Sequence, residues 1–513
     1  MKKYMILWIA VFGICSCENF LDVKPKSEIL GDKLFETAEG FEDALYGVYT
    51  HLGRADLYGK MLSWYMPDLL AAYYVKENVN TQWQLLLNFD YTNNQLADRK
   101  IFDNIWIQMY ENIGYVNDIL RYLDEHNDMR YHHFYKGEAL GLRAFMHLEL
   151  CNCFAPAYRE DTRDLPAIPY YERYEPLVQP FRTLEAVYRK VTDELQAAEA
   201  LLAEEGDYLT ADRTAVPGVP AFMTQRQFHM NLYAVQALLA RTYLMKNDLD
   251  SAMIYAEKVI ASGKFSFADK TNLANEYASC ISENETIWAV YPVSKWTDLM
   301  RECFDYAQDD MDRAMLPLNG FWVGMFGVEG WAVDYGFQTL YQVPNTEGRQ
   351  DFRYNAWFRQ REGVTGKHRR FYKIYRNTGE PDGQKGIHMI RIPEMYLIMA
   401  EGLLKKGDTE KAREYFDTYT RARGFYYKEE EAVFDMNLIN KEYRKEFFGE
   451  GREWFNRKRQ NLPFYSCMYS LNPPYPEGTD AKYTWPVPDD EFEYREGGRE
   501  GVYPPRQEEE QTH

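Results

Sequence analysis

The sequence predicts an all-α, predominantly helical protein, and three observations lead to this prediction. Apolar residues recur every three or four positions over long stretches, two segments 160 residues apart share one helix-pair pattern, and 46% of the 513 residues are hydrophobic. That apolar fraction, together with 27% charged residues, is typical of a folded protein with a substantial core. Wholly disordered, collagen-like and coiled-coil proteins are therefore excluded.

The longest apolar stripe runs through residues 102–123. Its spacing of three and four places the apolar side chains on one face of a long helix. These side chains are Phe102, Ile105, Trp106, Met109, Ile113, Val116, Leu120 and Leu123. We expect a second helix over residues 136–154, which Pro156, Pro166 and Pro169 then follow with a loop.

An internal repeat appears when residue 240 is aligned with residue 400. In the first copy, Ala240 and Ala252 are small enough to let two antiparallel helices approach closely, and Tyr243 lies between them in sequence. Ala400 and Ala412 take the equivalent positions in the second copy. This is the pattern of tetratricopeptide (TPR) helix pairs, which must pack on further helices. Two clear copies indicate pairs within one larger fold.

The first residues read as a secretion signal. Two lysines precede a mostly apolar run over residues 5–14, whose helical length of about 15 Å is too short to span a bilayer. Cys17, directly after Ser16, then fits the cleavage pattern of bacterial lipoproteins. We therefore expect a signal peptide over residues 1–16 and a lipid anchor on Cys17.

Charge and cysteine content exclude further classes. The chain has 59 Lys and Arg against 79 Asp and Glu, a formal charge of −20, which repels nucleic-acid backbones, so we expect no nucleic acid among its partners. Cys151 and Cys153 lie two positions apart on the predicted second helix, where their side chains point to nearly opposite sides. We interpret both as small buried residues, not as a disulfide or a metal site.

Candidate binding residues lie on predicted loops. Residues 290–385 are rich in glycine, aromatic and charged residues and have weak helical periodicity, which is typical of loops that carry binding. Sugar recognition uses flat aromatic faces against the ring and planar polar groups for the hydroxyls. The candidate ligand contacts are Asn80, Trp83, Trp296, Trp322, Trp331 and Tyr335. A core position is the alternative for each aromatic, and Trp106, on the helical stripe, is expected in the core.

A row of glutamates suggests an enzyme, but its spacing argues against one. Glycoside hydrolysis needs two carboxylates on opposite sides of a bond, usually from different elements. The row Glu442, Glu446, Glu450 and Glu453, interleaved with Arg444, Arg452 and Arg457, instead predicts ion pairs along a helix. The sequence contains no HExxH, GxSxG or GxGxxG motif. We therefore predict no catalytic residue, metal or cofactor.

Six segments, in order along the chain, resemble the SusD/RagB family of outer-membrane nutrient-binding lipoproteins. The first begins with the predicted acylated cysteine and continues with Glu-Asn-Phe-Leu-Asp, and the fourth coincides with the second TPR-like copy. The six are residues 17–25, 41–49, 139–145, 391–401, 446–452 and 485–488. Together they span nearly the whole chain after the predicted signal peptide.

The resemblance implies both an architecture and a function. The architecture is a SusD-like fold with about four TPR-like helix pairs and a loop-rich ligand-binding region. The function is to capture a glycan or another oligomeric nutrient at the cell surface and pass it to a TonB-dependent SusC-like transporter, without catalysis. The alternatives are a surface glycan hydrolase and a TPR-type adaptor that binds only proteins. The expected regions are a tether (17–40), an N-terminal helical region (41–270), a C-terminal region (271–497) that includes the TPR-like segment 391–424, and a disordered tail (498–513).

Overall fold

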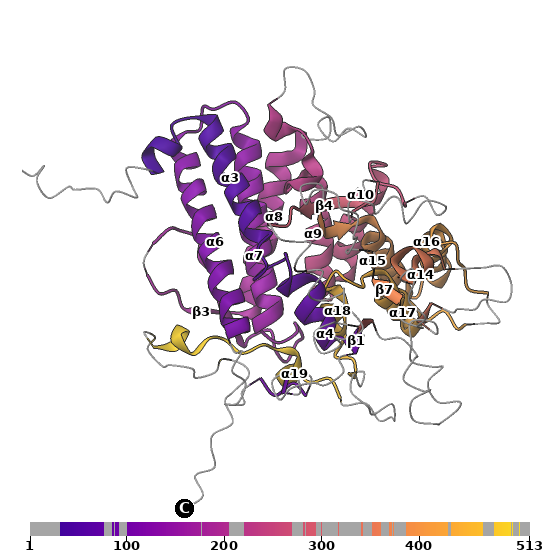
Figure 1. Cartoon of the computed structure of the whole chain (residues 1–513). Coiled ribbons are helices and arrows are strands. Elements are labelled where there is room, and N and C mark those ends of the chain that lie inside the picture. Colours follow the sequence, from indigo (N-terminus) through magenta and orange to yellow (C-terminus); the bar gives the residue numbers. More distant parts are fainter. Residues whose placement is uncertain are drawn as a thin grey trace, which may run out of the picture.

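Figure 1 shows the computed structural model of the chain. It describes residues 31–75, 85–86, 88–91, 100–175, 177–204, 220–268, 281–282, 284–293, 299, 316–317, 340–341, 351–360, 369–371, 373, 386–428, 432–464, 477–493, 495 and 502. The predicted signal peptide, Cys17 and most of the loop-rich region 290–385 lie outside these residues. Of the predicted tail, Val502 is described, and its side chain is buried.

Four helix pairs form the main body of the described chain. The pairs are α3 (Ala38–Leu52) with α6 (Lys100–Glu125), α7 (His132–Phe154) with α8 (Leu184–Leu202), α9 (Leu232–Met245) with α10 (Leu249–Ala261), and α15 (Ile392–Lys405) with α16 (Thr409–Ala422). The helices α3, α6, α7 and α8 stand side by side, and α10 packs on α15, which joins the third pair to the fourth (Figure 1). The predicted fold class, with about four TPR-like pairs, is confirmed.

The two long N-terminal helices follow their sequence patterns. All eight predicted stripe residues of α6 are buried, including Trp106. The helix α7 ends at Phe154, as predicted, but begins at His132, four residues earlier than expected. It is buried on nearly every side because α3, α6, α8 and α9 all pack against it. Cys151 and Cys153 are free and buried in this helix, which confirms their interpretation.

The 160-residue repeat is confirmed down to its turns. Asp248 accepts a hydrogen bond from the backbone N–H of Ser251 at the start of α10, and Asp408 caps α16 in the same way. Each cap follows a residue in the left-handed region, Asn247 with φ 58° and Gly407 with φ 87°. Aspartate is a preferred cap because its carboxylate satisfies a backbone donor that the helix itself leaves unpaired. The predicted small residues of both copies are completely buried.

Short elements join the helix pairs. The described strands form four two-stranded antiparallel sheets: β1 (Tyr74–Val75) with β5 (Leu316–Pro317), β2 (Pro166–Pro169) with β3 (Phe181–Thr183), β4 (Thr286–Val290) with β8 (Ile387–Arg391), and β6 (Phe358–Gln360) with β7 (Arg369–Phe371). The shorter helices are a π-helix (Met61–Tyr65), α4 (Met66–Leu70), η4 (Ala221–Met223), η5 (Arg226–Phe228), α14 (Phe352–Trp357), α17 (Met436–Glu446), α18 (Arg452–Gln460), α19 (Asp480–Tyr483) and η8 (Asp489–Phe492). Pairing of Val290 with Ile387 anchors the segment that follows β4.

The C-terminal segment closes one end of α7. The backbone N–H of Trp485 donates a hydrogen bond to the carbonyl of Cys153 at 2.9 Å. The ammonium group of Lys458, in α18, donates to the carbonyls of Asn152 and Ala155 at 2.6 and 2.5 Å. These donors satisfy carbonyls that the helix end leaves unpaired. One hydrophobic core therefore includes residues from both ends of the described chain.

Candidate functional site

The predicted ligand contacts cannot be placed by the described structure. Asn80, Trp83, Trp296, Trp322, Trp331 and Tyr335 all lie outside the described residues. They stay predictions, as does lipidation of Cys17. Among the described residues, the candidates for a functional site are the hollows and the clusters of charged side chains.

The glutamate row does not lie on one helix, which corrects the prediction. The helix α17 ends at Glu446, a turn with positive φ at Gly449 and Gly451 follows, and α18 begins at Arg452. Most partners of the row come from distant segments and not from the interleaved arginines. Glu442 pairs with Arg353 and Lys445, Glu446 with Arg353, Arg391 and Arg423, and Glu450 with Lys373 and Arg391, whereas Glu453 pairs with Arg444 and Arg457. Arg452 pairs instead with Glu149 of α7.

This buried ion-pair cluster is structural. Burial acts to raise the pKa of Glu446, but Arg423, Arg391 and Arg353 hold it well below its usual value. At Glu442, burial likewise acts to raise the pKa, but Lys445 and Arg353 lower it to about 2. A carboxylate that stays ionised at neutral pH cannot donate a proton as a general acid. The expected role of the row in ion pairs is confirmed, although the partners differ.

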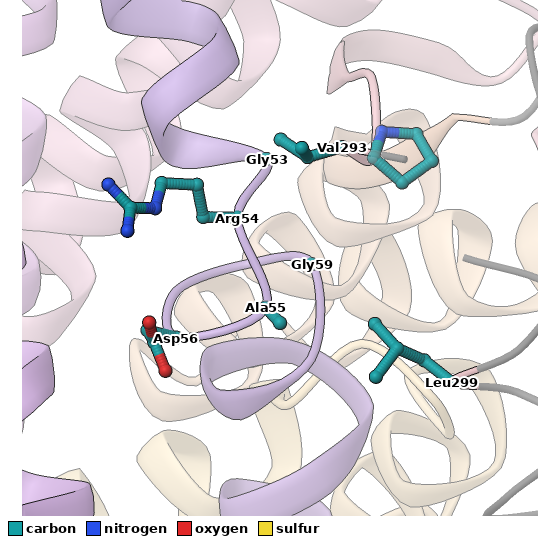
Figure 2. Close-up of a pocket in the computed structure, with 8 residues that line it drawn as sticks. Gly53, Arg54, Ala55, Asp56, Gly59, Val293 and Leu299 are labelled. Atoms are coloured by element: carbon teal, nitrogen blue, oxygen red, sulfur yellow. The ribbon is translucent and has the colours of Figure 1, made fainter. Parts of the chain in front are cut away.

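Two adjacent hollows lie where α3 ends and share Pro292 and Val293. The first, the loop hollow, has a volume of about 190 Å³ (Figure 2). It is lined by Gly53, Arg54, Ala55, Asp56, Gly59, Pro292, Val293 and Leu299. The second, the aromatic hollow, has a volume of about 200 Å³. It is lined by Tyr46, Tyr49, Thr50, Ala221, Thr224, Gln225, Phe228, His229, Tyr291, Pro292 and Val293.

A tight backbone contact holds the loop hollow in shape. The backbone N–H of Val293 donates to the carbonyl of Gly53 at 3.0 Å. A Cβ atom on Gly53 would lie 1.9 Å from the carbonyl oxygen of Tyr291, so only glycine fits there. Figure 2 shows Arg54 and Asp56 on the side of the loop away from Leu299. Their charged groups therefore flank this hollow and do not fill it.

The aromatic hollow contains a supported aromatic platform. The ring of Tyr291 stacks on that of Phe228 at 3.9 Å with an interplanar angle of 13°, while 42% of Tyr291 stays exposed. Phe228 thus covers one face of the Tyr291 ring, while Tyr291 as a whole lines the hollow and stays partly exposed. Its hydroxyl donates to Oε1 of Gln225 at 3.2 Å, which fixes the ring orientation. Tyr46 adds a second ring that is 40% exposed.

Helix α3 supplies one wall of this hollow because of its residue spacing. Tyr46, Tyr49 and Thr50 are three and four positions apart and lie on one face. Leu45, beside Tyr49 on the helix, and Val48 are completely buried in the core. One helix therefore packs against the core and also presents aromatic and hydroxyl groups to the hollow.

A buried polar network lies beneath the aromatic hollow. Glu138 of α7 accepts hydrogen bonds from the hydroxyl of Tyr49 and from the guanidinium of Arg226, each at 2.5 Å. Nδ1 of His229 lies 3.2 Å from the same carboxylate. Burial acts to raise the pKa of Glu138, but Arg226 and His229 lower it overall. Burial lowers the pKa of His229, Arg226 adds to this effect and Glu138 opposes it.

A third hollow, the α6 hollow, has a volume of about 440 Å³ and is lined partly by Trp106, Tyr110 and Asn117. Three of its polar side chains already make hydrogen bonds within the protein. Trp106 donates to Glu491 at 3.1 Å, Tyr110 to the carbonyl of Pro169 at 2.8 Å, and Asn117 to that of Tyr171 at 3.0 Å. The aromatic hollow is the stronger candidate, despite its smaller volume, because it contains the stacked rings of Tyr291 and Phe228.

Two further features are absent from the described part of the chain. There, no group of three or more His, Cys, Asp or Glu side chains is placed to hold a metal ion. Among the helices of the same residues, none has the length and apolar character needed to cross a membrane.

Comparison with known proteins identifies the family. A family model described as starch-binding and associating with the outer membrane matches residues 19–244, and the SusD family model matches residues 329–502. The chain belongs to the SusD/RagB family. The resemblance of the six short segments is thereby confirmed. No curated protein matches the chain.

Solved structures share the fold of this SusD/RagB protein at low sequence identity. A SusD superfamily protein from Bacteroides thetaiotaomicron is 20% identical, with a TM-score of 0.66, and the match covers 89% of this chain and 97% of that one. A putative sugar binding protein from Bacteroides vulgatus is 18% identical, with a TM-score of 0.66, covering 88% and 95%. Surface glycan-binding protein A from Bacteroides thetaiotaomicron is 18% identical, with a TM-score of 0.61, covering 90% and 97%.

Sequence reasoning missed the described candidate residues of this SusD/RagB protein. Tyr291 directly precedes Pro292, which marks the end of β4, and an aromatic next to such a proline was a usable signal. Tyr46 lies within the segment 41–49 that carried the family resemblance, but there it was counted only as part of a helix. His229 had no local signal, because its partner Glu138 is 91 residues away in sequence.

Proposed function

We propose that this protein is a non-catalytic, cell-surface binding protein that captures a glycan or another oligomeric nutrient and delivers it to a TonB-dependent SusC-like transporter. The platform of Tyr291, backed by Phe228, is the observation that carries the proposal. A sugar ring presents an apolar face that stacks on an aromatic ring and hydroxyls that need polar partners. Thr224 and Gln225 supply such partners in the same hollow.

The comparisons support this proposal. Two proteins of similar fold carry the names surface glycan-binding protein A and putative sugar binding protein. The family model that matches the N-terminal half is described by starch binding and by association with the outer membrane. The ion pairs of Glu442 and Glu446 argue against a surface glycan hydrolase that uses this row, because these two carboxylates are held ionised.

A binding screen of the full chain in detergent tests the proposal. Isothermal titration with starch, mannan, xylan and levan oligosaccharides measures affinity, and a reducing-end assay on the same mixtures detects hydrolysis. We expect at least one oligosaccharide to bind without release of reducing ends. Released ends would favour the hydrolase, and binding to a barrel partner without any oligosaccharide or peptide ligand would favour the adaptor.

Substitution of the platform locates the site. Tyr291→Ala removes the stacking face, and we expect about a tenfold loss of affinity, or about 1.4 kcal/mol. Tyr174→Ala is the matched control, because Tyr174 is 61% exposed and lines the α6 hollow. If only the Tyr174 variant loses affinity, the ligand binds in the α6 hollow and our assignment is wrong. The six predicted contacts outside the described residues, such as Trp322 and Trp331, are tested in the same assay.

The proposed attachment to the outer membrane rests on Cys17. Acyl chains on this residue would hold the protein at the membrane, since each buried methylene contributes about 0.8 kcal/mol. We expect Cys17→Ser to release the protein from the membrane fraction of cells that export it, while the parent stays there. A parent protein that is recovered free in the cytosol with residues 1–16 still present would contradict the anchor.

A further inference from the structure

His229 is a buried polar side chain in the wall of the aromatic hollow, at only 3% exposure. Its Nδ1 atom lies 3.2 Å from a carboxylate oxygen of Glu138. An ionised carboxylate only accepts hydrogen bonds, so Nδ1 must carry the proton. In the neutral imidazole, Nε2 then has a lone pair and acts as an acceptor.

The surroundings of His229 hold it in this form. Glu138 is fixed from both sides, by Arg226 at one carboxylate oxygen and by Tyr49 at the other. The rings of Tyr46 and Phe222 pack edge-on to the imidazole at 5.6 and 4.6 Å. The ionisable groups that face it are therefore Glu138, Arg226, Tyr46 and Tyr49, on α7, η5 and α3.

Nε2 of His229 forms no hydrogen bond with any residue that the structure describes. Buried polar atoms almost always have a partner, and one that lines a hollow obtains it from what enters the hollow. An acceptor in this position favours a donor group. Hydroxyls donate, whereas carboxylates and sulfates have no proton to give at neutral pH.

We propose that Nε2 of His229 accepts a hydrogen bond from a hydroxyl of a neutral sugar ring that stacks on Tyr291. This inference rests on the proposed function and adds the charge class of the ligand. The carboxylate of a uronic acid or the sulfate of a sulfated sugar, placed at this position, would bring a second acceptor against the His229 lone pair, with the Glu138 carboxylate behind it.

Titration of the full chain with charged and uncharged sugars tests the charge class. The neutral probes are maltohexaose, mannohexaose and xylohexaose, and the acidic probe is hexagalacturonic acid at low salt and pH 7.5. We expect at least one neutral hexasaccharide to bind at least tenfold more tightly than the acidic one. Tighter binding of hexagalacturonic acid than of every neutral probe would overturn the proposal.

Two substitutions then separate the two imidazole nitrogens. Asparagine places its amide near Nδ1, so His229→Asn keeps a donor for Glu138 and removes the acceptor at Nε2. Glutamine reaches the position of Nε2, so His229→Gln restores an oxygen there. For the tightest neutral probe we expect a loss of about five- to twentyfold in His229→Asn and a smaller loss in His229→Gln.

Nitrogen-15 NMR of the parent protein gives a direct readout of the two imidazole nitrogens. With labelled histidine, and the His229 signal assigned by its absence in His229→Asn, we expect Nε2 to resonate as an unprotonated nitrogen and to shift when the neutral probe binds. If the probe binds, Tyr291→Ala weakens it, and yet His229→Asn and the Nε2 signal are unaffected, this inference fails and the proposed function stands. If no oligosaccharide binds, this inference fails, and if no peptide oligomer binds either, the proposed function fails as well.

Discussion

Arg241 of α9 donates two parallel hydrogen bonds to the carboxylate of Glu394 in α15. Nε and Nη2 of the arginine each lie 2.7 Å from one carboxylate oxygen, and Nη2 also donates to the carbonyl of Met389 at 2.9 Å. Both side chains of the ion pair are 2% exposed. The pair therefore joins the two copies of the repeat through the interior, and the planar arginine fork is well suited to this bidentate contact.

We expect Arg241→Met to lower the free energy of unfolding by about 3–5 kcal/mol. The substitution leaves the carboxylate of Glu394 buried without its partner, and removal of one member of a buried pair costs about this much. Urea unfolding followed by circular dichroism measures the change.

An exposed ion pair between the same two repeat copies serves as the control. Lys406 lies 2.6 Å from Asp250, and their side chains are 45% and 67% exposed. Because water screens such a pair, Lys406→Met should change the free energy of unfolding by less than about 1 kcal/mol. If the two variants lose the same free energy of unfolding, burial of the Arg241–Glu394 pair does not increase its contribution to stability.

The stability of the protein should fall as the pH drops below about 6.5, and His147 should contribute to this fall. Burial and the neighbouring Arg143 lower the pKa of His147 to about 3. The unfolded chain takes up this proton near pH 6.5, so the contribution is complete above that pH and is lost as the pH falls towards 3. The slope is at most about 1.4 kcal/mol per pH unit for one group.

The variant His147→Phe isolates this contribution. It keeps a ring to stack on Tyr170, which lies 3.7 Å from the imidazole, but it cannot be protonated. Between pH 5 and 6.5 we expect the unfolding free energy of the variant to depend less on pH than that of the parent. His133→Gln, at a histidine whose side chain is 39% exposed, is the control for the removal of a histidine. If the unfolding free energy of all three proteins depends equally on pH, the proposed contribution of His147 is wrong.

Gly53→Ala should disturb the candidate site and the fold together. Its Cβ atom would lie 1.9 Å from the carbonyl oxygen of Tyr291, so the segment that carries the platform must move. We expect a loss of about 1–3 kcal/mol in unfolding free energy and weaker oligosaccharide binding. Gly47→Ala, within α3, is the matched control, whereas Gly53 follows the end of that helix. Because no heavy atom lies within 4 Å of a Cβ at Gly47, this variant should gain about 0.5–1 kcal/mol of stability. If Gly53→Ala binds oligosaccharide as tightly as the parent, the loop at Gly53 does not shape the binding site.

Cys151 and Cys153 should resist alkylation in the native state. Burial raises the pKa of Cys151 to about 12, and it raises that of Cys153 as well. The reactive thiolate is then about a thousandfold rarer than in an ordinary cysteine, and the reagent also has no access. Peptide mass spectrometry after iodoacetamide treatment at pH 8 should find both residues labelled only in urea. Equal labelling rates with and without urea would show that α7 opens readily.

The sequence was sufficient where a feature depends on residues close together in the chain. The stripe of α6 and the repeat of α9–α10 in α15–α16 follow from helical spacing alone, and even the turns at Asn247 and Gly407 match. The glutamate row shows the opposite case. Its spacing looked continuous because the left-handed turn at Gly449 and Gly451 leaves no mark in an apolar pattern.

The candidate site depends on contacts between distant segments. Tyr291 becomes a platform only because Phe228 stacks behind it, and Phe228 lies 63 residues earlier. Likewise His229 becomes an acceptor only because Glu138 orients its ring. Residue type and local spacing carry no information about such pairs, so sequence reasoning favoured tryptophans on loops instead.

The contact between Trp485 and Cys153 has a consequence for biogenesis. Until residue 485 emerges, the last turn of α7 keeps a bare carbonyl, and the apolar side chains around Phe154 are open to water. We therefore expect an unfinished polypeptide to expose apolar surface at that end and to aggregate more readily than the complete one. A premature stop codon shortly before that tryptophan would leave a product that quality-control proteases degrade.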